Sequence, residues 1–401
     1  MFKITNDIYS VGAFNPNMRI FDIVMRTEYG TSYNSFIVKG DKIALIDGCH
    51  ETFTKQFITN IEEIIPLNKI DYLIVNHCEP DHTGALKELI TRVPNIEIYC
   101  SPSSSIFLKE ITKLPLKLHV VKNGDKLSLG NKTLEFINAP FLHWPDSMFT
   151  YAKEDKTVFT CDFLGSHYCE PTMIDTKITY LDEYKPSVKL YYDVIFGPFK
   201  KYVNDGLDKL SKLDCDFICT SHGPVLTKGG LYKYVFDQYR DWSKIVPTKL
   251  SIPIFYASSY GYTKKIAQTI KEGILLANKN IEANVYNVNY FDSASLATIM
   301  NQSTAFCIGS PTLNKNAVPP ISHLLMDIDT INIQDKPVLV FGSYGWSGEA
   351  QNILINVAKS LKLKPYEKNI HIRFAATEEQ LNEARDIAKS FALSVQSSSA
   401  K

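Results

Sequence analysis

Four potential metal ligands stand within six residues of the chain: His77, Glu79, Asp81 and His82. The apolar run 71–75 before them has the length and composition of a buried strand, and residues 85–90 after them predict a helix. A loop at the end of a strand is a common place for a binding site. A polar turn that only caps the helix is the alternative, but four side chains of metal-ligand type favour a metal site.

Three further candidates, His143, Asp162 and His222, each follow an apolar, strand-like run. The carboxyl ends of such strands gather at one edge of an α/β layer, where ligands bind. Taken singly, each histidine fits a structural role, but the shared context places all three with the first cluster. Seven donors are too many for one metal ion and suit two, with Asp162 best placed to bridge. Four imidazoles and three carboxylates suit iron, manganese or zinc, and the carboxylate share favours iron over zinc.

A second candidate site lies in three loops of the C-terminal part, at 258–263, 309–314 and 343–348. The first loop stands between a predicted strand (252–257) and a predicted helix (263–276), where backbone N–H groups can close around a phosphate. It matches neither the triphosphate loop nor the dinucleotide motif. It resembles the flavodoxin phosphate loop, and the other two loops would border a flavin ring. The candidate cofactor-binding residues are Ser258, Ser259, Tyr260, Gly261, Tyr262, Thr263, Ser310, Pro311, Thr312, Asn314, Ser343, Tyr344, Gly345, Trp346, Ser347 and Gly348.

The elements that must position these residues fall into two series. Up to residue 245, short strands alternate with helices and hairpin turns, which indicates a mixed α/β layered fold. The polar stretch 240–249 contains Pro247 and reads as a linker. From 252 to 392 a five-fold strand–helix repeat has the size of one doubly wound domain. The Ser-rich tail 394–401 is predicted to be disordered.

Composition excludes several classes of function. The 401 residues include 43 basic and 43 acidic side chains, so a zero formal charge offers no footprint for nucleic acid or a membrane surface. The N-terminus lacks a signal-peptide pattern, no apolar run approaches membrane-spanning length, and a cytoplasmic protein is expected. Eight scattered cysteines form no Cys-x-x-Cys pair, so buried free thiols are expected rather than an iron–sulfur or rubredoxin site.

The motif His-x-Glu-x-Asp-His at residues 77–82, followed by His, Asp and His at strand ends, resembles that of the flavodiiron proteins. Zinc hydrolases of the metallo-β-lactamase type have a second histidine where this chain has Glu79. The resemblance covers nearly the whole chain, and all seven ligand positions match. It implies one iron held by His77, Glu79 and His143, a second held by Asp81, His82 and His222, and a bridging Asp162.

The resemblance also implies a fold and an activity. Residues 1–245 would form a metallo-β-lactamase-like αββα sandwich with the diiron site, and residues 250–393 a flavodoxin-like doubly wound parallel sheet that binds FMN. Electrons would pass through FMN to the irons and reduce O2 to water, with reduction of NO to N2O as the alternative. A zinc hydrolase and a flavodoxin-like carrier with a purely structural first domain are the rival hypotheses.

The resemblance further implies partners for this minimal two-domain arrangement. With no rubredoxin module expected, the electron donor would be a separate rubredoxin-like protein or a reduced deazaflavin. The two cofactors of one chain would be far apart, so a head-to-tail homodimer, or a dimer of such dimers, is expected. His167, Tyr168 and Trp144 lie near the ligands in sequence without an assigned role.

Overall fold

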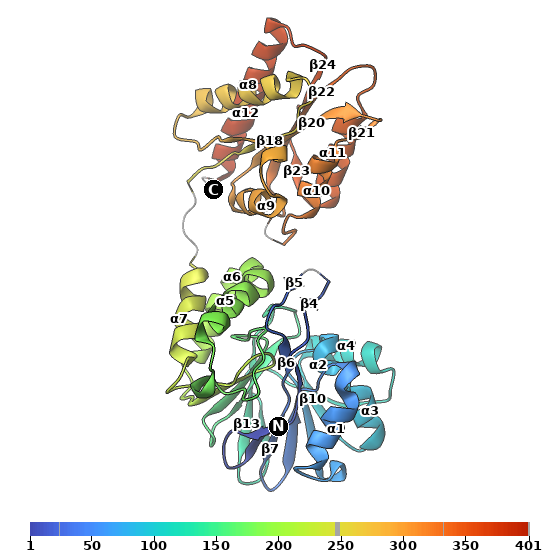
Figure 1. The fold of residues 1–401 in the computed structure, drawn as a ribbon, viewed down its shortest axis with the longest axis vertical. Helices are drawn as coiled ribbons and strands as arrows, with labels where there is room; N and C mark the ends of the chain where they lie inside the picture. The colour runs from blue at the N-terminus through green and yellow to red at the C-terminus, as the bar shows by residue number, and fades with distance from the viewer. Residues whose placement is uncertain (24, 245–248, 332, 400–401) are drawn as a thin grey trace. The chain divides into compact units, whose positions relative to one another are not determined.

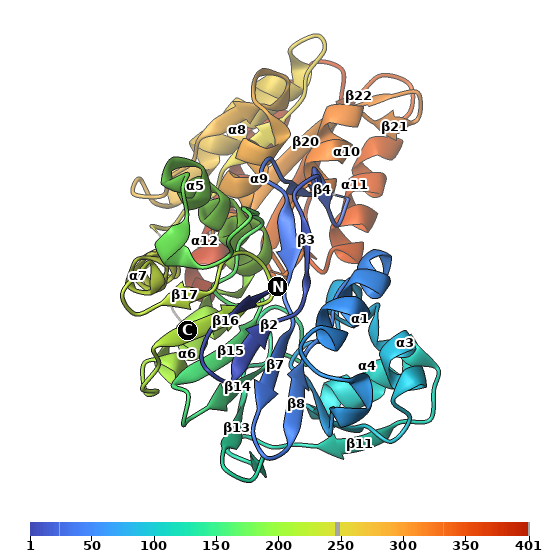
Figure 2. The ribbon, with the colours of Figure 1, turned by 60° about the horizontal axis from the view of Figure 1, so that its bottom comes forward.

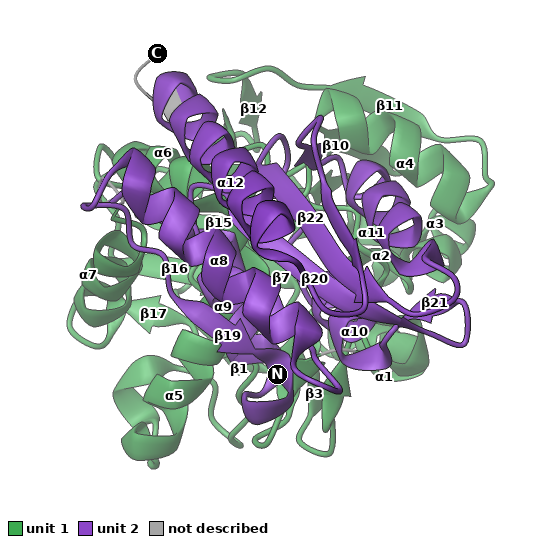
Figure 3. Ribbon diagram, turned by 90° about the horizontal axis from the view of Figure 1, so that it is seen from above, with its two compact units in different colours: residues 1–245 green, residues 246–401 purple. Residues whose placement is uncertain are grey.

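The computed structural model describes residues 1–23, 25–244, 249–331 and 333–399 of the chain. The chain divides into two compact units, Met1–Ile245 and Val246–Lys401, which Figure 3 draws in different colours. Among the described residues, no helix is both long enough and apolar enough to cross a bilayer.

Unit 1 is built on two mixed sheets that lie face to face (Figure 2). In spatial order, the first sheet contains β1 (Phe2–Lys3), β2 (Ile8–Ser10), β7 (Phe36–Lys39), β8 (Ile43–Ile46), β9 (Tyr72–Val75), β10 (Glu97–Cys100) and β11 (Lys117–Val120). The second contains β12 (Lys126–Ser128), β13 (Thr133–Asn138), β14 (Met148–Ala152), β15 (Thr157–Cys161), β16 (Phe217–Thr220) and β17 (Leu226–Thr227). Two small ribbons pair β3 (Ala13–Asn15) with β6 (Thr31–Tyr33), and β4 (Ile20–Phe21) with β5 (Met25–Arg26).

Helices cover the outer faces of both sheets in unit 1 (Figure 1). The first sheet is covered by α1 (Thr54–Glu62), α3 (Leu86–Arg92) and α4 (Pro102–Thr112), and the second by α5 (Leu181–Tyr191), α6 (Lys200–Leu210) and α7 (Tyr232–Trp242). The strands are apolar on both faces because both faces are buried. On β9, Leu73 packs toward the helices while Ile74 packs between the sheets; on β15, Val158 and Phe159 divide in the same way. The predicted αββα sandwich is thereby confirmed.

Unit 2 is a parallel sheet with helices on both faces. Its strands lie in the order β19 (Val285–Asn287), β18 (Ile254–Tyr256), β20 (Phe306–Leu313) and β22 (Pro337–Tyr344), and β22 also pairs with β23 (Lys364–Pro365) and β24 (Ile370–Arg373). The short β21 (Asn316–Ala317) folds back antiparallel on β20. One face is covered by α8 (Tyr262–Ala277) and α12 (Glu378–Ser399), the other by α9 (Ser293–Gln302), α10 (Pro319–Met326) and α11 (Glu349–Ser360). This confirms the predicted flavodoxin-like doubly wound sheet.

Two expectations about the chain's connections differ from the structure. The predicted linker 240–249 overlaps α7, which runs to Trp242, and residues 245–248 lie outside the described residues. The predicted disordered tail from 394 is wrong up to Ser399, because α12 continues to that residue. Phe391, Ala392 and Val395 extend the apolar stripe of α12 and are buried in the cluster that α8 also joins, so packing outweighs the Ser-rich composition.

Candidate metal centre and flavin pocket

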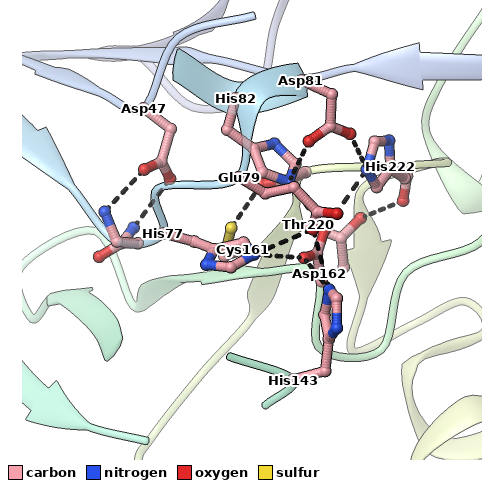
Figure 4. Close-up of polar contacts among 12 residues, drawn as sticks. Asp47, His77, Glu79, Asp81, His82, His143, Cys161, Asp162, Thr220 and His222 are labelled. Carbon is pink, nitrogen blue, oxygen red and sulfur yellow. Dashed lines mark hydrogen bonds and ion pairs between the residues drawn. The ribbon is translucent and has the colours of Figure 1, made fainter. Parts of the chain in front are cut away.

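The carboxyl ends of parallel strands bring the metal-ligand candidates together. His77 follows β9 of the first sheet after a single residue, whereas Asp162 directly follows β15 of the second and His222 lies two residues beyond β16. His143 lies in the loop between β13 and β14. All seven sequence-predicted residues converge, as Figure 4 shows, in two groups whose ligand atoms lie within 4.8 Å of one another. The groups are His77, Glu79, His143 and Asp162, and Asp81, His82 and His222.

A single helical turn, α2 (Pro80–Thr83), presents Asp81 and His82 to the centre. Pro80 opens this turn, where its fixed φ and missing N–H are tolerated. The main-chain oxygen of His82 accepts a hydrogen bond from Gly48 N at 3.0 Å, which ties the turn to the end of β8. Sequence reasoning placed a helix only from residue 85, because a four-residue turn shows no periodicity.

Asp162 presents one carboxylate oxygen to each group. Its Oδ2 lies 3.4 Å from His77 Nε2 and 3.5 Å from His143 Nε2. Its Oδ1 lies 3.1 Å from His82 Nε2 and 3.4 Å from His222 Nε2. This is the arrangement that a carboxylate bridging two metal ions requires.

Each group also contains a carboxylate of its own. Glu79 Oε2 lies 3.2 Å from His77 Nε2 and 2.9 Å from His143 Nε2. Asp81 lies 3.3 Å from His82 Nε2 through Oδ1, and 3.0 Å from His222 Nε2 through Oδ2. All four imidazoles therefore turn Nε2 toward the carboxylates.

The buried polar atoms of this centre fit a pair of cations. Within the described residues, both carboxylate oxygens of Asp81 and of Asp162, and both ring nitrogens of His82, are buried without a hydrogen-bond partner. Buried polar atoms are rarely left without a hydrogen bond, and these carboxylate oxygens face imidazole Nε2 atoms at 3.0 to 3.5 Å without forming one. A donor set of imidazoles and carboxylates suits divalent iron, manganese or zinc.

Neighbouring acceptors orient two of the imidazoles. Asp146, which is fully buried, accepts from His77 Nδ1 at 3.2 Å and from the main-chain N–H of Cys78 at 2.7 Å. His222 Nδ1 donates to the main-chain oxygen of Ser32 at 2.7 Å. In the neutral rings these contacts hold the hydrogen on Nδ1, so that the Nε2 lone pair would face a bound metal ion. Sequence reasoning missed Asp146, although it lies in the same segment as His143.

The charges of the metal-free centre are paired internally. Burial alone would raise the pKa of Glu79, but His143 and His77 hold it below its ordinary value. Burial would lower the pKa of His82, but Asp81 and Asp162 raise it to about 9. His143 is likewise raised to about 9, against the effect of burial, by Asp162 and Glu79. The metal-free centre therefore contains protonated imidazoles beside ionised carboxylates.

Other residues near the centre differ in what they contact. The Trp144 ring packs edge-on against His77, with 5.2 Å between ring centroids. Tyr168 hydrogen-bonds to Glu170 through its hydroxyl. Asp22, which sequence reasoning missed, is close enough for burial and the charge of Glu79 to raise its pKa to about 6. Nothing in its local sequence signals this proximity, because it depends on how the β4–β5 ribbon folds over.

In unit 2, residues from all three segments predicted as loops line one pocket of about 330 Å³. Two of these predictions are wrong in part, because residues 309–313 lie in β20 and residues 343–344 in β22. The predicted residues that line it are Ser258, Ser259, Tyr260, Tyr262, Thr263, Pro311, Thr312, Ser343, Tyr344, Gly345 and Trp346. Gly261, Ser310, Asn314, Ser347 and Gly348 do not line it, and sequence reasoning missed two lining residues, Leu313 and Phe374. Ser310 is buried and instead accepts the main-chain N–H of Val318 at 3.0 Å.

The first of these loops has the geometry of an anion site. Gly261 has a φ of +87° and donates its N–H to Ser258 Oγ at 3.1 Å, after which α8 begins at Tyr262. The N-terminus of a helix of this length favours a phosphate. Thr263 and Ser343 join their hydroxyl groups at 2.8 Å, and this contact ties the first turn of α8 to the end of β22.

Trp346 and Tyr260 are the most exposed aromatic side chains at the pocket, with 77% and 86% of their surface accessible. Apolar rings at the rim of a polar, phosphate-accepting pocket suit the flat ring system of a flavin.

The fold and the two sites define a two-unit redox protein, with a metal centre in a metallo-β-lactamase-like unit and a flavin pocket in a flavodoxin-like unit. Residues 31–223 match the family model "ODP family beta lactamase", and residues 254–387 match "Flavodoxin". The flavo-diiron protein FprA2 of Clostridium acetobutylicum is 48% identical over 98% of this chain and 99% of its own. The chain therefore belongs to the flavo-diiron protein family, whose cofactors are FMN and a pair of non-haem irons.

Two further relatives carry functional names. The anaerobic nitric oxide reductase flavorubredoxin of Pectobacterium atrosepticum is 33% identical over 86% of this chain and 68% of its own. The solved structure of rubredoxin oxygen:oxidoreductase from Desulfovibrio gigas has a TM-score of 0.68 and 25% identity, with full coverage of both chains.

Proposed function

We propose that this protein reduces O2 to water at a diiron centre held by His77, Glu79, Asp81, His82, His143, Asp162 and His222. The observation that carries the proposal is the bridging geometry of Asp162, which shares its two oxygens between two groups of buried donors. A flavin pocket in the same chain supports a redox reaction rather than hydrolysis, since hydrolysis needs no flavin. Residues 1–245 would be the diiron domain and residues 250–393 the FMN domain.

The electron count suits this pair of cofactors. Reduction of O2 to two waters needs four electrons and four protons, and FMN and the iron pair can supply two electrons each. Within the chain, the seven ligands would hold the metals and the pocket of unit 2 would position FMN. Asp146 and the Ser32 carbonyl orient two of the imidazoles. The buried ligands, none of them more than slightly exposed, exclude bulk water from the centre.

Reduction of two NO to N2O and water is the second candidate, because it uses the same ligands and needs only two electrons. It is supported by the similarity to a relative named as a nitric oxide reductase. The name of a second relative, an oxygen oxidoreductase, supports the first candidate.

The proposal also includes an electron donor and a pairing of two chains. Electrons would come from a separate rubredoxin-like protein or a reduced deazaflavin, as the name of the rubredoxin-dependent relative suggests. Head-to-tail pairing of two chains, in the cytoplasm, would bring the FMN of one chain to the irons of the other. A monomer in light scattering that keeps full turnover would argue against this pairing.

The decisive experiment combines metal analysis with rapid kinetics. Purified protein should contain about two irons and one FMN per chain. After anaerobic reduction, reoxidation by O2 and by NO is compared by stopped-flow absorbance, and faster reoxidation by O2 is expected. Zinc in place of iron, or reoxidation without turnover of either gas, would refute the proposal.

Matched variants separate the centre from the rest of the fold. His82→Ala should lose metal and gas reduction while FMN stays bound. His119→Ala is the control, because His119 is half-exposed on β11 and pairs with Glu97 away from the centre. Gas reduction that survives the loss of metal would contradict the assignment.

A further inference from the structure

His167 is buried beside the metal centre without being one of its ligands. Only 4% of its surface is exposed. Its ring centroid lies 4.8 Å from that of His222, 4.3 Å from that of Phe21 and 4.9 Å from that of Tyr191. Within the described part of the chain, its Nε2 has no hydrogen-bond partner. A buried ring nitrogen in that state is rare and requires an explanation.

The other ring nitrogen of His167 is anchored on β6. His167 Nδ1 lies 2.9 Å from Thr31 Oγ1, and Thr31 is itself fully buried. Thr31 Oγ1 also lies 3.3 Å from His222 Nδ1, which is 2.7 Å from the Ser32 carbonyl. A carbonyl oxygen only accepts, so His222 Nδ1 carries a hydrogen, and Thr31 accepts that hydrogen at the longer distance.

This network favours one position for the hydrogen of the His167 ring. The hydroxyl hydrogen of Thr31 can go to His167 Nδ1 at 2.9 Å or to the Ser32 carbonyl at 3.2 Å. The carbonyl already accepts the shorter bond from His222, so His167 Nδ1 is the better acceptor. His167 is then the tautomer with its hydrogen on Nε2, on the opposite edge of the ring from Thr31.

The His167 ring lies directly against a ring of the metal centre, that of His222. The charges of His222, Asp162, Glu79 and His82 all act on the His167 ring, so the ring is within electrostatic reach of both ligand groups. In the described structure, none of these carboxylates forms a hydrogen bond with it. The Nε2–H group is therefore available to a molecule bound among the ligands.

We propose that His167 binds the exogenous ligand of the metal centre, by donating a hydrogen bond from Nε2 to a diatomic molecule or small anion held on the irons. This inference rests on the proposed diiron function and adds to it a binding residue that is not a metal ligand. Azide is a suitable probe, because it is a small anion that accepts hydrogen bonds and binds oxidised iron with a visible charge-transfer band.

Two substitutions separate binding from support of the fold. In His167→Gln the side-chain amide reaches the position of Nε2, whereas in His167→Asn it reaches only that of Nδ1 and keeps the contact with Thr31. Azide titrations of the iron-loaded, oxidised full-length protein give the dissociation constant for each. We expect His167→Asn to weaken azide binding about tenfold and His167→Gln less than about threefold, with iron content unchanged in both.

Other results of the azide titration and of the iron analysis would refute either the role of His167 or the proposed function. Equal azide affinity in the parent and both variants, or greater loss in His167→Gln than in His167→Asn, refutes the binding role of Nε2. Loss of iron in both variants also refutes it, because His167 would then support the ligands rather than the bound molecule. A parent protein without iron would refute the proposed function itself, and the inference with it.

Discussion

Metal loading of this centre should release about three protons per chain near pH 7.5. The metal-free centre holds His82 and His143 with pKa values of about 9, and His77 with a pKa well above its ordinary value, against the effect of burial in each case. At pH 7.5 an imidazole with a pKa of about 9 is ~97% protonated, whereas an unperturbed one is only about 10% protonated. Metal binding to Nε2 requires the neutral ring, so each of these protons must leave.

The assay is isothermal titration of metal-free protein with Fe²⁺, without oxygen, in buffers of different ionisation enthalpy. The slope of the apparent enthalpy against buffer enthalpy counts the protons released. Three unperturbed imidazoles would together release only about 0.3 protons. A slope below about one proton would refute the internal pairing described for the centre. The His119→Ala variant should give the parent's slope, because His119 lies outside the centre.

The raised pKa values of these histidines also make the stability of the metal-free protein depend on pH. The folded-state pKa values of His82 and His143 are raised above the unfolded value of about 6.5. Their contribution to the free energy of unfolding is therefore fully present below about pH 6.5 and is lost as pH rises through about 9. A shift of this size corresponds to about 3 kcal/mol for one group, and the two contributions do not add because both imidazoles share Asp162. Urea unfolding from pH 6 to pH 10 should show this loss in the metal-free form.

Three substitutions test the surroundings of the two sites. Asp146→Asn should weaken metal affinity about 10- to 100-fold, measured by competition with a chelator, because it removes the charge that orients His77; unchanged affinity would contradict that role. Thr263→Ala should weaken FMN binding, measured by fluorescence titration, and leave the iron content unchanged; unaltered FMN affinity would count against the phosphate loop. Phe391→Ala should destabilise unit 2 by about 3–5 kcal/mol in denaturant unfolding, since the ring is fully buried; a change below about 1 kcal/mol would show that α12 is not docked there.

The convergence of the candidate metal ligands was predictable from sequence because most of them follow a local rule. His77, Asp162 and His222 each lie at or just beyond the carboxyl end of a strand, and residues 77–82 form one continuous motif. The edges of parallel strands then guarantee that distant ligands meet. No comparable rule finds Asp146 or Thr31, whose roles depend on a contact across 69 and 136 residues of chain. Such contacts are set by tertiary packing and produce no periodic pattern in the sequence.

The flavin pocket shows which features of a site local sequence patterns do not predict. The three segments lie at the predicted edge of the sheet, but residues 309–313 belong to β20 and residues 343–344 to β22 rather than to loops. Gly261 and Ser310 lie outside the pocket lining, since Gly261 forms the turn before α8 and Ser310 accepts the N–H of Val318. Phe374 enters the lining from β24's end, with a φ of +56° that no sequence pattern in the loop indicated. The tail was mispredicted for a related reason, because composition was weighed without the apolar spacing that docks α12.

The three carboxylates of the centre are distributed evenly between its two ligand groups, which the ligand types alone did not show. Glu79 belongs to the group of His77 and His143, Asp81 to that of His82 and His222, and Asp162 is shared. Each cation position thus has two imidazoles, one carboxylate of its own and half of a bridge. A histidine in place of Glu79 would leave one position without its own negative charge. Because carboxylates stabilise the more highly charged state of a metal ion, this even distribution of carboxylates would suit two irons of similar redox behaviour.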